Sequence, residues 1–126
     1  MSVEKNWFKH YPPGVKKEID ISAYNSIMTV FDEGVRKFRT GNAFTNMGVT
    51  ITFEDLDREV GKFASFLQNE LKLKKGDRIA IQMPNLLQFP IILFAALRVG
   101  LIIVNTNPLY TAKEMRHQFK DSGAKA

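Results

Sequence analysis

The sequence predicts a layered α/β fold built around two parallel strands and the helix that joins them. Residues 78–83 contain β-branched isoleucines and end at Pro84, which cannot continue a strand ladder. Residues 86–99 are almost entirely apolar, and residues 101–104 form a short apolar run without polar alternation, as expected for a parallel strand buried on both faces. Two such strands joined by a helix make a right-handed βαβ unit. We therefore expect a parallel sheet flanked by helices, with an N-terminal helix and a β-hairpin before it.

The bounds of the central helix are predicted from its flanking residues. Asn85 is suited to cap its N-terminus, and Gly100 stands where a helix C-terminus commonly places glycine. With Asn85 as the cap, Pro90 lies past the first turn and should kink or delay the helix, so we expect regular geometry from about Pro90 onward. The run is shorter than the roughly 18 apolar residues that span a membrane, which favours a buried helix.

An amphipathic helix is expected first, over about residues 26–39, and it ends at the Thr40-Gly41-Asn42 sequence. Its apolar residues recur at helical spacing, with charged residues on the other side. These apolar residues are Ile27, Phe31, Val35 and Phe38.

Two short β-rich segments come next, residues 43–46 and 49–52, separated by Met47 and Gly48. Strands this close together are typical of a β-hairpin. Gly48 supplies the positive φ angle that such a turn needs.

A second amphipathic helix opens at Thr52, where Thr52 and Asp55 have the spacing of a capping box. Its apolar stripe predicts a helix that packs on a sheet face. The stripe consists of Leu56, Val60, Phe63, Ala64, Leu67 and Leu71. Residues 72–77 then form the loop that returns the chain to the first parallel strand.

A second capping box, Thr111 with Glu114, starts a helix at Ala112 that should end at Gly123. Met115 and Phe119 are expected to supply its buried side. A β-α-β-α series calls for another strand, which would begin at residues 124–126, where the sequence stops. We therefore expect part of a larger domain.

The N-terminal residues 1–21 form an irregular arm, and residues 22–126 form the α/β part. The arm carries Trp7, Phe8 and Tyr11 before a Pro-Pro-Gly sequence. Exposed aromatic side chains are costly, so the arm should pack on something. Its own domain, a neighbouring subunit and a membrane surface all stay open as the partner.

The composition excludes several classes of function. The 126 residues contain no cysteine and only two histidines, His10 and His117, so disulfides, thiolate chemistry and a zinc site are not expected. The net charge of +5 comes from scattered lysines without a recognition helix, and we expect no nucleic-acid partner. The N-terminus lacks the apolar core of a signal peptide, which favours the cytoplasm.

The sequence contains no motif for phosphate binding, nucleophilic catalysis or metal binding, because GxxxxGK[ST], GxGxxG, GxSxG, HExxH and DxDxDG are all missing. Asn105, Asn107 and Tyr110 follow a parallel strand at the end where α/β sheets place ligands. They are interpreted as turn residues, with a cleft wall as the alternative. Residue chemistry alone thus stops at an α/β domain of unassigned function.

Several segments nevertheless resemble a known superfamily in unbroken order. Residues 51–56 (ITFEDL) resemble the first core motif of adenylate-forming enzymes, residues 76–85 their next strand, and residues 96–111 their second core motif. Residues 114–123 are similar to the segment after that second motif. Within the superfamily the chain is most similar to bacterial long-chain fatty acyl-CoA synthetases, at residues 11–12, 43–48, 73–78 and 83–88.

The resemblance implies that the chain is an incomplete, N-terminal part of the large AMP-binding domain. The whole enzyme would use Mg²⁺ and ATP to convert a long-chain fatty acid to an acyl-adenylate, and would then transfer the acyl group to CoA. In such enzymes the phosphate loop, the adenine contacts and the catalytic lysine lie downstream of the segment covered here. We therefore assign no catalytic, cofactor-binding or metal-binding residue between Met1 and Ala126, and expect the chain alone to be inactive with no cofactor bound.

Partners implied by the resemblance are a long-chain fatty acid, ATP and CoA. A homodimer and peripheral association with the inner face of the membrane stay open. Two alternatives are a non-enzymatic module for self-association or membrane docking, and the same portion of another acyl- or aryl-CoA ligase.

Overall fold

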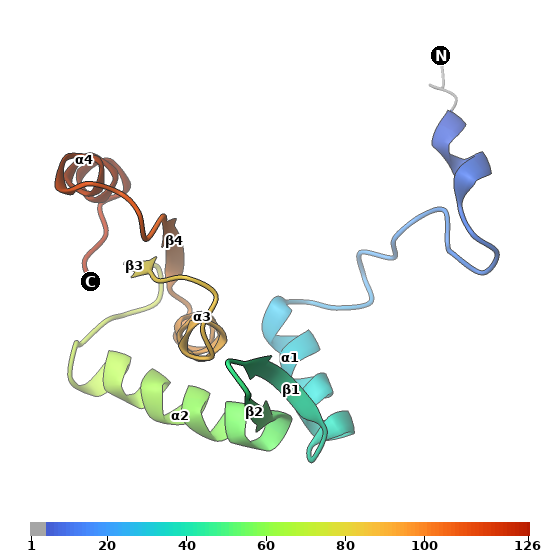
Figure 1. Ribbon diagram of the computed structural model, residues 1–126, viewed down its shortest axis with the longest axis horizontal. Helices are drawn as coiled ribbons and strands as arrows, with labels where there is room; N and C mark the ends of the chain where they lie inside the picture. The colour runs from blue at the N-terminus through green and yellow to red at the C-terminus, as the bar shows by residue number, and fades with distance from the viewer. Residues whose placement is uncertain (1–4) are drawn as a thin grey trace.

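A computed structural model describes residues 5–126, which fold into α-helices and two small sheets after a single 3₁₀ turn. In chain order the elements are η1 (Asn6–His10), α1 (Ile27–Phe38), β1 (Asn42–Asn46), β2 (Val49–Thr52), α2 (Phe53–Asn69), β3 (Arg78–Gln82), α3 (Gln88–Val99), β4 (Ile102–Thr106) and α4 (Ala112–Ser122) (Figure 1). The α/β architecture expected from the sequence is confirmed.

The strands β3 and β4 pair in parallel within one sheet, from Arg78 opposite Ile102 to Gln82 opposite Thr106. Helix α3 connects the two strands and contacts both. The predicted βαβ unit is therefore present. Because the strands are parallel and in register, their carboxyl ends lie at the same edge of the sheet.

The hydrophobic core lies mainly between α2 and α3, which pack against each other more extensively than any other pair of elements. Ala95 and Ala96 of α3 are fully buried, and their small side chains allow α2 to approach closely. Phe31 of α1 packs against one side of this core, with its ring centroid 4.3 Å from that of Phe94 in α3. The other buried core residues are Leu56, Val60, Ala64, Leu67, Leu73, Ile79, Val99 and Leu101.

Helix α1 begins after Ser26, whose hydroxyl accepts a hydrogen bond from the amide of Thr29 at 3.1 Å. Its predicted apolar side is only partly buried. Phe31 is buried, but Ile27 is 62% exposed and Phe38 is 51% exposed. These two residues lie at the helix ends, and α1 contributes only Phe31 to the buried core.

The predicted hairpin is confirmed, with β1 and β2 antiparallel and Asn46 opposite Val49. Gly48 has a φ angle of +79°, and Met47 also lies in the left-handed region at +49°. Across the pair, the hydroxyls of Thr45 and Thr50 lie 2.7 Å apart.

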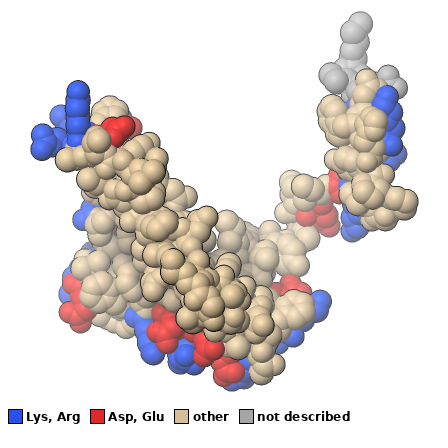
Figure 2. All heavy atoms as spheres, viewed as in Figure 1, with Lys and Arg blue, Asp and Glu red and all other residues tan. Residues whose placement is uncertain are grey.

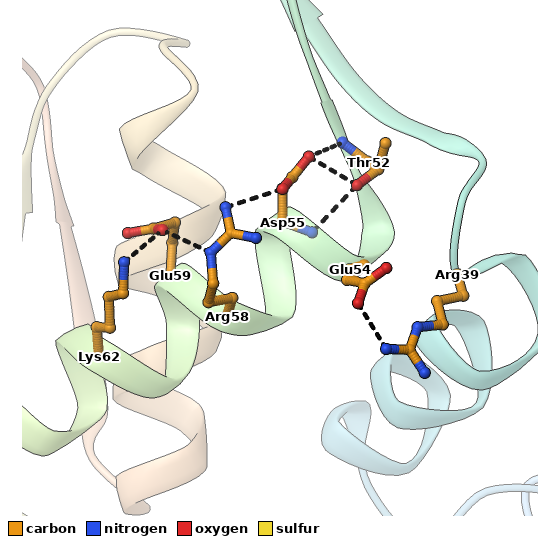
Figure 3. A network of polar contacts seen from close by, with 7 residues as sticks. All are labelled: Arg39, Thr52, Glu54, Asp55, Arg58, Glu59 and Lys62. Carbon is orange, nitrogen blue, oxygen red and sulfur yellow. Dashed lines mark hydrogen bonds and ion pairs between the residues drawn. The ribbon is translucent and has the colours of Figure 1, made fainter.

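The predicted capping box of α2 is present and begins a network of polar contacts (Figure 3). Asp55 accepts hydrogen bonds from the Thr52 hydroxyl and amide, and the Thr52 hydroxyl accepts one from the Asp55 amide. These hydrogen bonds hold the pKa of Asp55 below its ordinary value, helped by Arg58. Further along α2, Glu59 contacts Arg58 and Lys62. Leu71, predicted on the buried stripe, lies beyond the end of α2 and is 43% exposed.

The start of α3 differs from the prediction. Asn85 is not its N-cap, because the helix begins at Gln88 after Leu87 and has no side-chain cap. Pro90 is therefore the third helical residue, where an amide has no intrahelical partner and proline costs no hydrogen bond. Gly100 ends the helix in the left-handed conformation, as predicted.

Strand β4 is not buried on both faces, which corrects the prediction for residues 101–104. Ile102 is 47% exposed, whereas Leu101, which precedes the strand, is buried. Successive side chains of a strand point to opposite faces of the sheet, and Ile102 lies on a face that the described residues leave largely open, whereas Ile103 on the other face is half-buried. One apolar side chain of the strand thus has little cover in residues 5–126.

Helix α4 begins after the predicted Thr111–Glu114 capping box and ends at Gly123 in the left-handed conformation. Its expected buried residues, Met115 and Phe119, are half-buried, and no residue of α4 is fully buried. The helix touches the body mainly through β4.

After α4 the chain turns back beside β3. The amide of Lys125 donates to the carbonyl of Arg78 at 2.8 Å, and the amide of Ala80 donates to the carbonyl of Ala126 at 2.7 Å. Residues 124–126 and β3 run in the same direction here. They meet along the edge of β3 that does not pair with β4. Residues 124–126 are not a strand, but their hydrogen bonds lie where the sequence predicts the next one.

The arm extends away from the α/β body (Figure 1). The Phe8 ring contacts the rings of both Trp7 and Tyr11, whose centroids lie 5.9 Å and 5.4 Å from its own. Trp7 nevertheless stays 53% exposed. Within residues 5–126 the arm thus leaves much of its apolar surface uncovered. Within residues 5–126, the helices are all too short or too polar to cross a bilayer.

Candidate functional site

The candidate site is the edge of the sheet where β3 and β4 both end. Gln82 at the end of β3 donates through Nε2 to the carbonyl of Asn107, 3.4 Å away. Thr106 at the end of β4 is 5% exposed, and its hydroxyl donates to the carbonyl of Val104. Polar side chains thus gather at this edge, as the strand order predicts.

Asn107 and Tyr110, two of the three residues interpreted as turn residues from the sequence, belong to the turn after β4. The Asn107 side-chain oxygen accepts from the amide of Leu109 at 3.0 Å, and the Asn107 carbonyl accepts from the amide of Tyr110 at 3.1 Å. This is the ordinary turn role of asparagine, in which the side chain mimics a backbone acceptor. Asn105, predicted to follow the strand, lies instead within β4, opposite Ile81, and is exposed.

An open hollow of about 660 Å³ lies along α4, and half-buried Tyr110 is at its start. Glu114 lies in this hollow, and the Thr111 hydroxyl and amide hold its pKa below the ordinary value by donating hydrogen bonds. The Glu114 carboxylate is therefore already engaged in the N-terminal cap of α4. The hollow is otherwise lined by Lys113, His117, Gln118 and Asp121.

Sequence reasoning missed two polar side chains, Gln82 and Gln118. Gln118 of α4 donates through Nε2 to the carbonyl of Asn105 at 3.1 Å, while its Oε1 is buried without a hydrogen-bond partner among the described residues. The sequence did contain a signal for Gln118, which is a polar residue on the apolar side of α4. It adjoins Phe119 and lies three residues after Met115. Gln82 gave only a weak signal, as a polar residue at the end of an apolar strand.

An apolar groove of about 380 Å³ lies between the hairpin and α3. Asn46 holds its two sides together by donating through Nδ2 to the carbonyl of Asn85 at 3.1 Å. The face of the molecule over α3 and the hairpin carries few charged groups, whereas both signs of charge gather along the outer side of α2 (Figure 2). The groove is lined mainly by Phe44, Leu86, Leu87, Phe89, Pro90, Leu93 and Phe94.

The chemistry available at these places is limited. Within residues 5–126, no three histidine, aspartate or glutamate side chains cluster as a metal site would require. The eight glycines of the chain stand singly and form no phosphate loop.

Comparison with known proteins gives a family match over most of the chain. The model of the AMP-binding enzyme family matches residues 31–126. The chain is 52% identical over 124 residues to a long-chain-fatty-acid–CoA ligase of Haemophilus influenzae and 33% identical over 122 residues to that of Bacillus subtilis. These matches cover 98% and 97% of the chain. The chain spans about a fifth of the length of these relatives, 22% and 21% respectively.

The fold is also similar to solved structures. The N-terminal subdomain of Klebsiella oxytoca NpsA matches with a TM-score of 0.75 at 25% identity, over 80% of this chain and 26% of that one. The N-terminal subdomain of the same protein in complex with 3-hydroxyanthranilyl-AMSN gives a TM-score of 0.76 at 24% identity, over 81% and 26% of the two chains. The structural likeness thus agrees with the match of sequence.

Proposed function

Because the chain belongs to the AMP-binding enzyme family, we propose that it forms the N-terminal supporting portion of a long-chain fatty acid–CoA ligase. The observation that carries the proposal is the 52% identity with the Haemophilus influenzae ligase across 98% of the chain. A match to an Arabidopsis thaliana protein, 4-coumarate–CoA ligase-like 8, is lower, at 29% over 87% of the chain. This difference favours a long-chain fatty acid over an aryl acid as the substrate.

In the proposed reaction, a long-chain fatty acid reacts with ATP in the presence of Mg²⁺ to give an acyl-adenylate and pyrophosphate. The thiol of CoA then takes the acyl group and releases AMP. The role of this chain is structural support. Enzymes that activate substrates with ATP depend on precise positioning of the reacting groups and on charges that stabilise the transition state. Helix α3 packs on the parallel sheet, and α2 packs on α3.

The proposed division of the chain is an arm over residues 1–21 and the N-terminal part of the AMP-binding domain over residues 22–126. We also propose that the protein works in the cytoplasm. Its net charge of +5 is compatible with approach to anionic membrane lipids, where long-chain fatty acids partition.

The test measures acyl-CoA formation from a long-chain fatty acid, ATP and CoA. The purified 126-residue chain is expected to form none, and the whole ligase to require all three substrates. A whole protein that turns over only aryl acids would rule out the fatty acid. A whole protein that forms no acyl-CoA from any acid would rule out the ligase.

A further inference from the structure

The outer face of α4 carries a row of basic side chains, which we call the basic stripe. Its members recur at the i, i+3, i+4, i+7 spacing that places residues on one face of a helix. They are Lys113, Arg116, His117 and Lys120, and all are exposed. Met115 and Phe119, on the other side of α4, are half-buried. Figure 2 shows lysine and arginine atoms gathered at the end of the molecule where Figure 1 places α4.

The charges of the basic stripe are not neutralised by neighbouring carboxylates. Lys113, Arg116 and Lys120 form no ion pair within residues 5–126. The carboxylates of α4 belong to Glu114 and Asp121, which lie about a quarter turn around the helix from Lys113. On α2 the arrangement is the opposite, because the exposed charges alternate in sign and pair along the helix.

The basic stripe opposes the local stability of α4. Like charges three or four residues apart destabilise a helix, and this applies to Lys113 with Arg116 and to Arg116 with Lys120. Lys113 also lies in the first turn, at the end where the helix dipole favours negative charge. A local arrangement that costs stability, with no compensating contact in residues 5–126, indicates a surface used for binding.

We propose that the basic stripe of α4 binds an acidic helix of a partner protein. From Lys113 to Lys120 the stripe is about 10 Å long, and its cations recur about once per 5.4 Å turn of the helix. Carboxylates at the same spacing on a second helix therefore meet all the cations at once. Complementary charges of this kind fix the register of two partners and speed their encounter.

Other anionic partners fit the basic stripe less well. Docking on a lipid bilayer uses an apolar helix face, and the apolar side of α4 is turned toward the body instead. Arg116 and Lys120 lie outside the hollow that Lys113 and His117 line, so the cations do not converge on one small phosphate group. Tight binding of a nucleic acid uses more phosphate contacts than these side chains supply, and the stripe holds no aromatic side chain to stack on a base.

The test uses the ¹⁵N-labelled 126-residue chain and a synthetic helical peptide with glutamates at positions i, i+3, i+4 and i+7. A second peptide has the same composition, but its glutamates are distributed around the whole helix. We expect the first peptide to shift the amide signals of α4 in NMR spectra. It should bind about fivefold more tightly than the second peptide, as one or two exposed ion pairs would give. Added salt should weaken the binding, because it screens exposed charges.

Charge reversal is the sharpest change to the basic stripe. Lys113→Glu with Arg116→Glu and Lys120→Glu should abolish binding of the glutamate peptide. The same variant should bind a peptide with lysines in place of the glutamates. The milder Lys113→Gln with Lys120→Gln should weaken binding of the glutamate peptide by about fivefold to tenfold. All three positions are exposed, and circular dichroism checks that the helices still form.

The matched control, Lys9→Gln with Lys16→Gln, removes the same net charge from two exposed positions of the arm. It should bind the glutamate peptide as the parent chain does. Equal weakening by the arm and stripe variants would overturn the proposal, as would equal binding of the two glutamate peptides or α4 signals that neither peptide shifts.

Two further probes test the other partner classes. Anionic vesicles or single-stranded DNA that shift the α4 signals at lower concentration than the glutamate peptide would overturn the proposal, and would assign the stripe to a membrane or a nucleic acid. The measurements do not use ligase activity. An inactive whole protein would therefore remove only the proposed ligase function, and absent peptide binding would remove only the partner surface.

Discussion

Arg98 of α3 donates a hydrogen bond from Nη2 to Oδ1 of Asp57 in α2, at 2.7 Å. The same nitrogen lies 3.4 Å from Oδ1 of Asp32 in α1, and the guanidinium lies 5.5 Å from the centre of the Phe31 ring. One side chain thus joins three helices. It does so at the boundary of the core that supports the parallel sheet.

Replacing Arg98 by methionine should lower the free energy of unfolding by about 1 kcal/mol, from partly exposed ion pairs and one cation–π contact. Methionine keeps much of the apolar length of the side chain. Urea denaturation measures the change. Arg58→Met is the matched control, because Arg58 pairs only with Asp55 and Glu59 of its own helix in the described structure, and should cost less than about 0.5 kcal/mol. Equal losses in the two variants would contradict a role for Arg98 between helices.

Leu67 lies fully buried between α2 and its neighbours. Leu67→Ala should lower the free energy of unfolding by about 2–5 kcal/mol, because it removes apolar contacts and leaves a cavity. Leu109→Ala makes the same chemical change at a residue that is 86% exposed, and should change stability by less than about 0.5 kcal/mol. A small loss at Leu67 would show that the core between α2 and α3 is not formed.

Replacement by alanine should change the stability of the fold in opposite directions at two glycines. Gly100 has a φ angle of +82°, and an added Cβ would lie 3.0 Å from Cγ of Lys75, so Gly100→Ala should destabilise by about 1 kcal/mol or more. Gly61 is inside α2, where the nearest atom to an added Cβ is Nη1 of Arg98 at 3.8 Å. Gly61→Ala should stabilise by about 0.5–1 kcal/mol. Melting temperatures measured under identical conditions test both signs.

The elements that the sequence predicts well are those with local signals. The two capping boxes at Thr52 and Thr111 and the positive φ angle of Gly48 depend on neighbouring residues only, and all three are confirmed. The prediction for the start of α3 is wrong, because Asn85 satisfies the local preference for a cap but the chain stays irregular until Gln88.

Burial is less predictable than the elements themselves. Ile102 and Phe38 look like core residues by pattern, yet Ile102 is 47% exposed and Phe38 is 51% exposed among residues 5–126. At the candidate site, Gln82 and Gln118 acquire their roles only through hydrogen bonds to carbonyls that lie 25 and 13 residues away in the sequence. Local patterns do not encode such contacts.

Stability should fall in acid through the carboxylates of α2 and its neighbours. Hydrogen bonds from Thr52 and the nearby Arg58 hold the pKa of Asp55 below its ordinary value. A carboxylate with a lowered folded-state pKa contributes stability that is fully present above its unfolded pKa of about 4, and that is lost as pH falls through the folded value.

The free energy of unfolding should therefore decrease below about pH 4. The decrease should be smaller for Asp55→Asn, which has no carboxylate to protonate at this position. Urea titrations from pH 7 to pH 2 measure both curves. Gly61→Ala serves as the control, since it should shift the whole curve by a constant amount. An unchanged slope in Asp55→Asn would contradict the contribution of the capping box.

The central claim, that this chain is the supporting portion of a long-chain fatty acid–CoA ligase, is tested most directly by a chimera. The segment of the Haemophilus influenzae ligase that the chain matches is replaced by residues 1–126, and acyl-CoA formation is measured with a long-chain fatty acid, ATP and CoA. The account predicts an active chimera that requires all three substrates. A chimera that is folded and monodisperse but forms no acyl-CoA would contradict it.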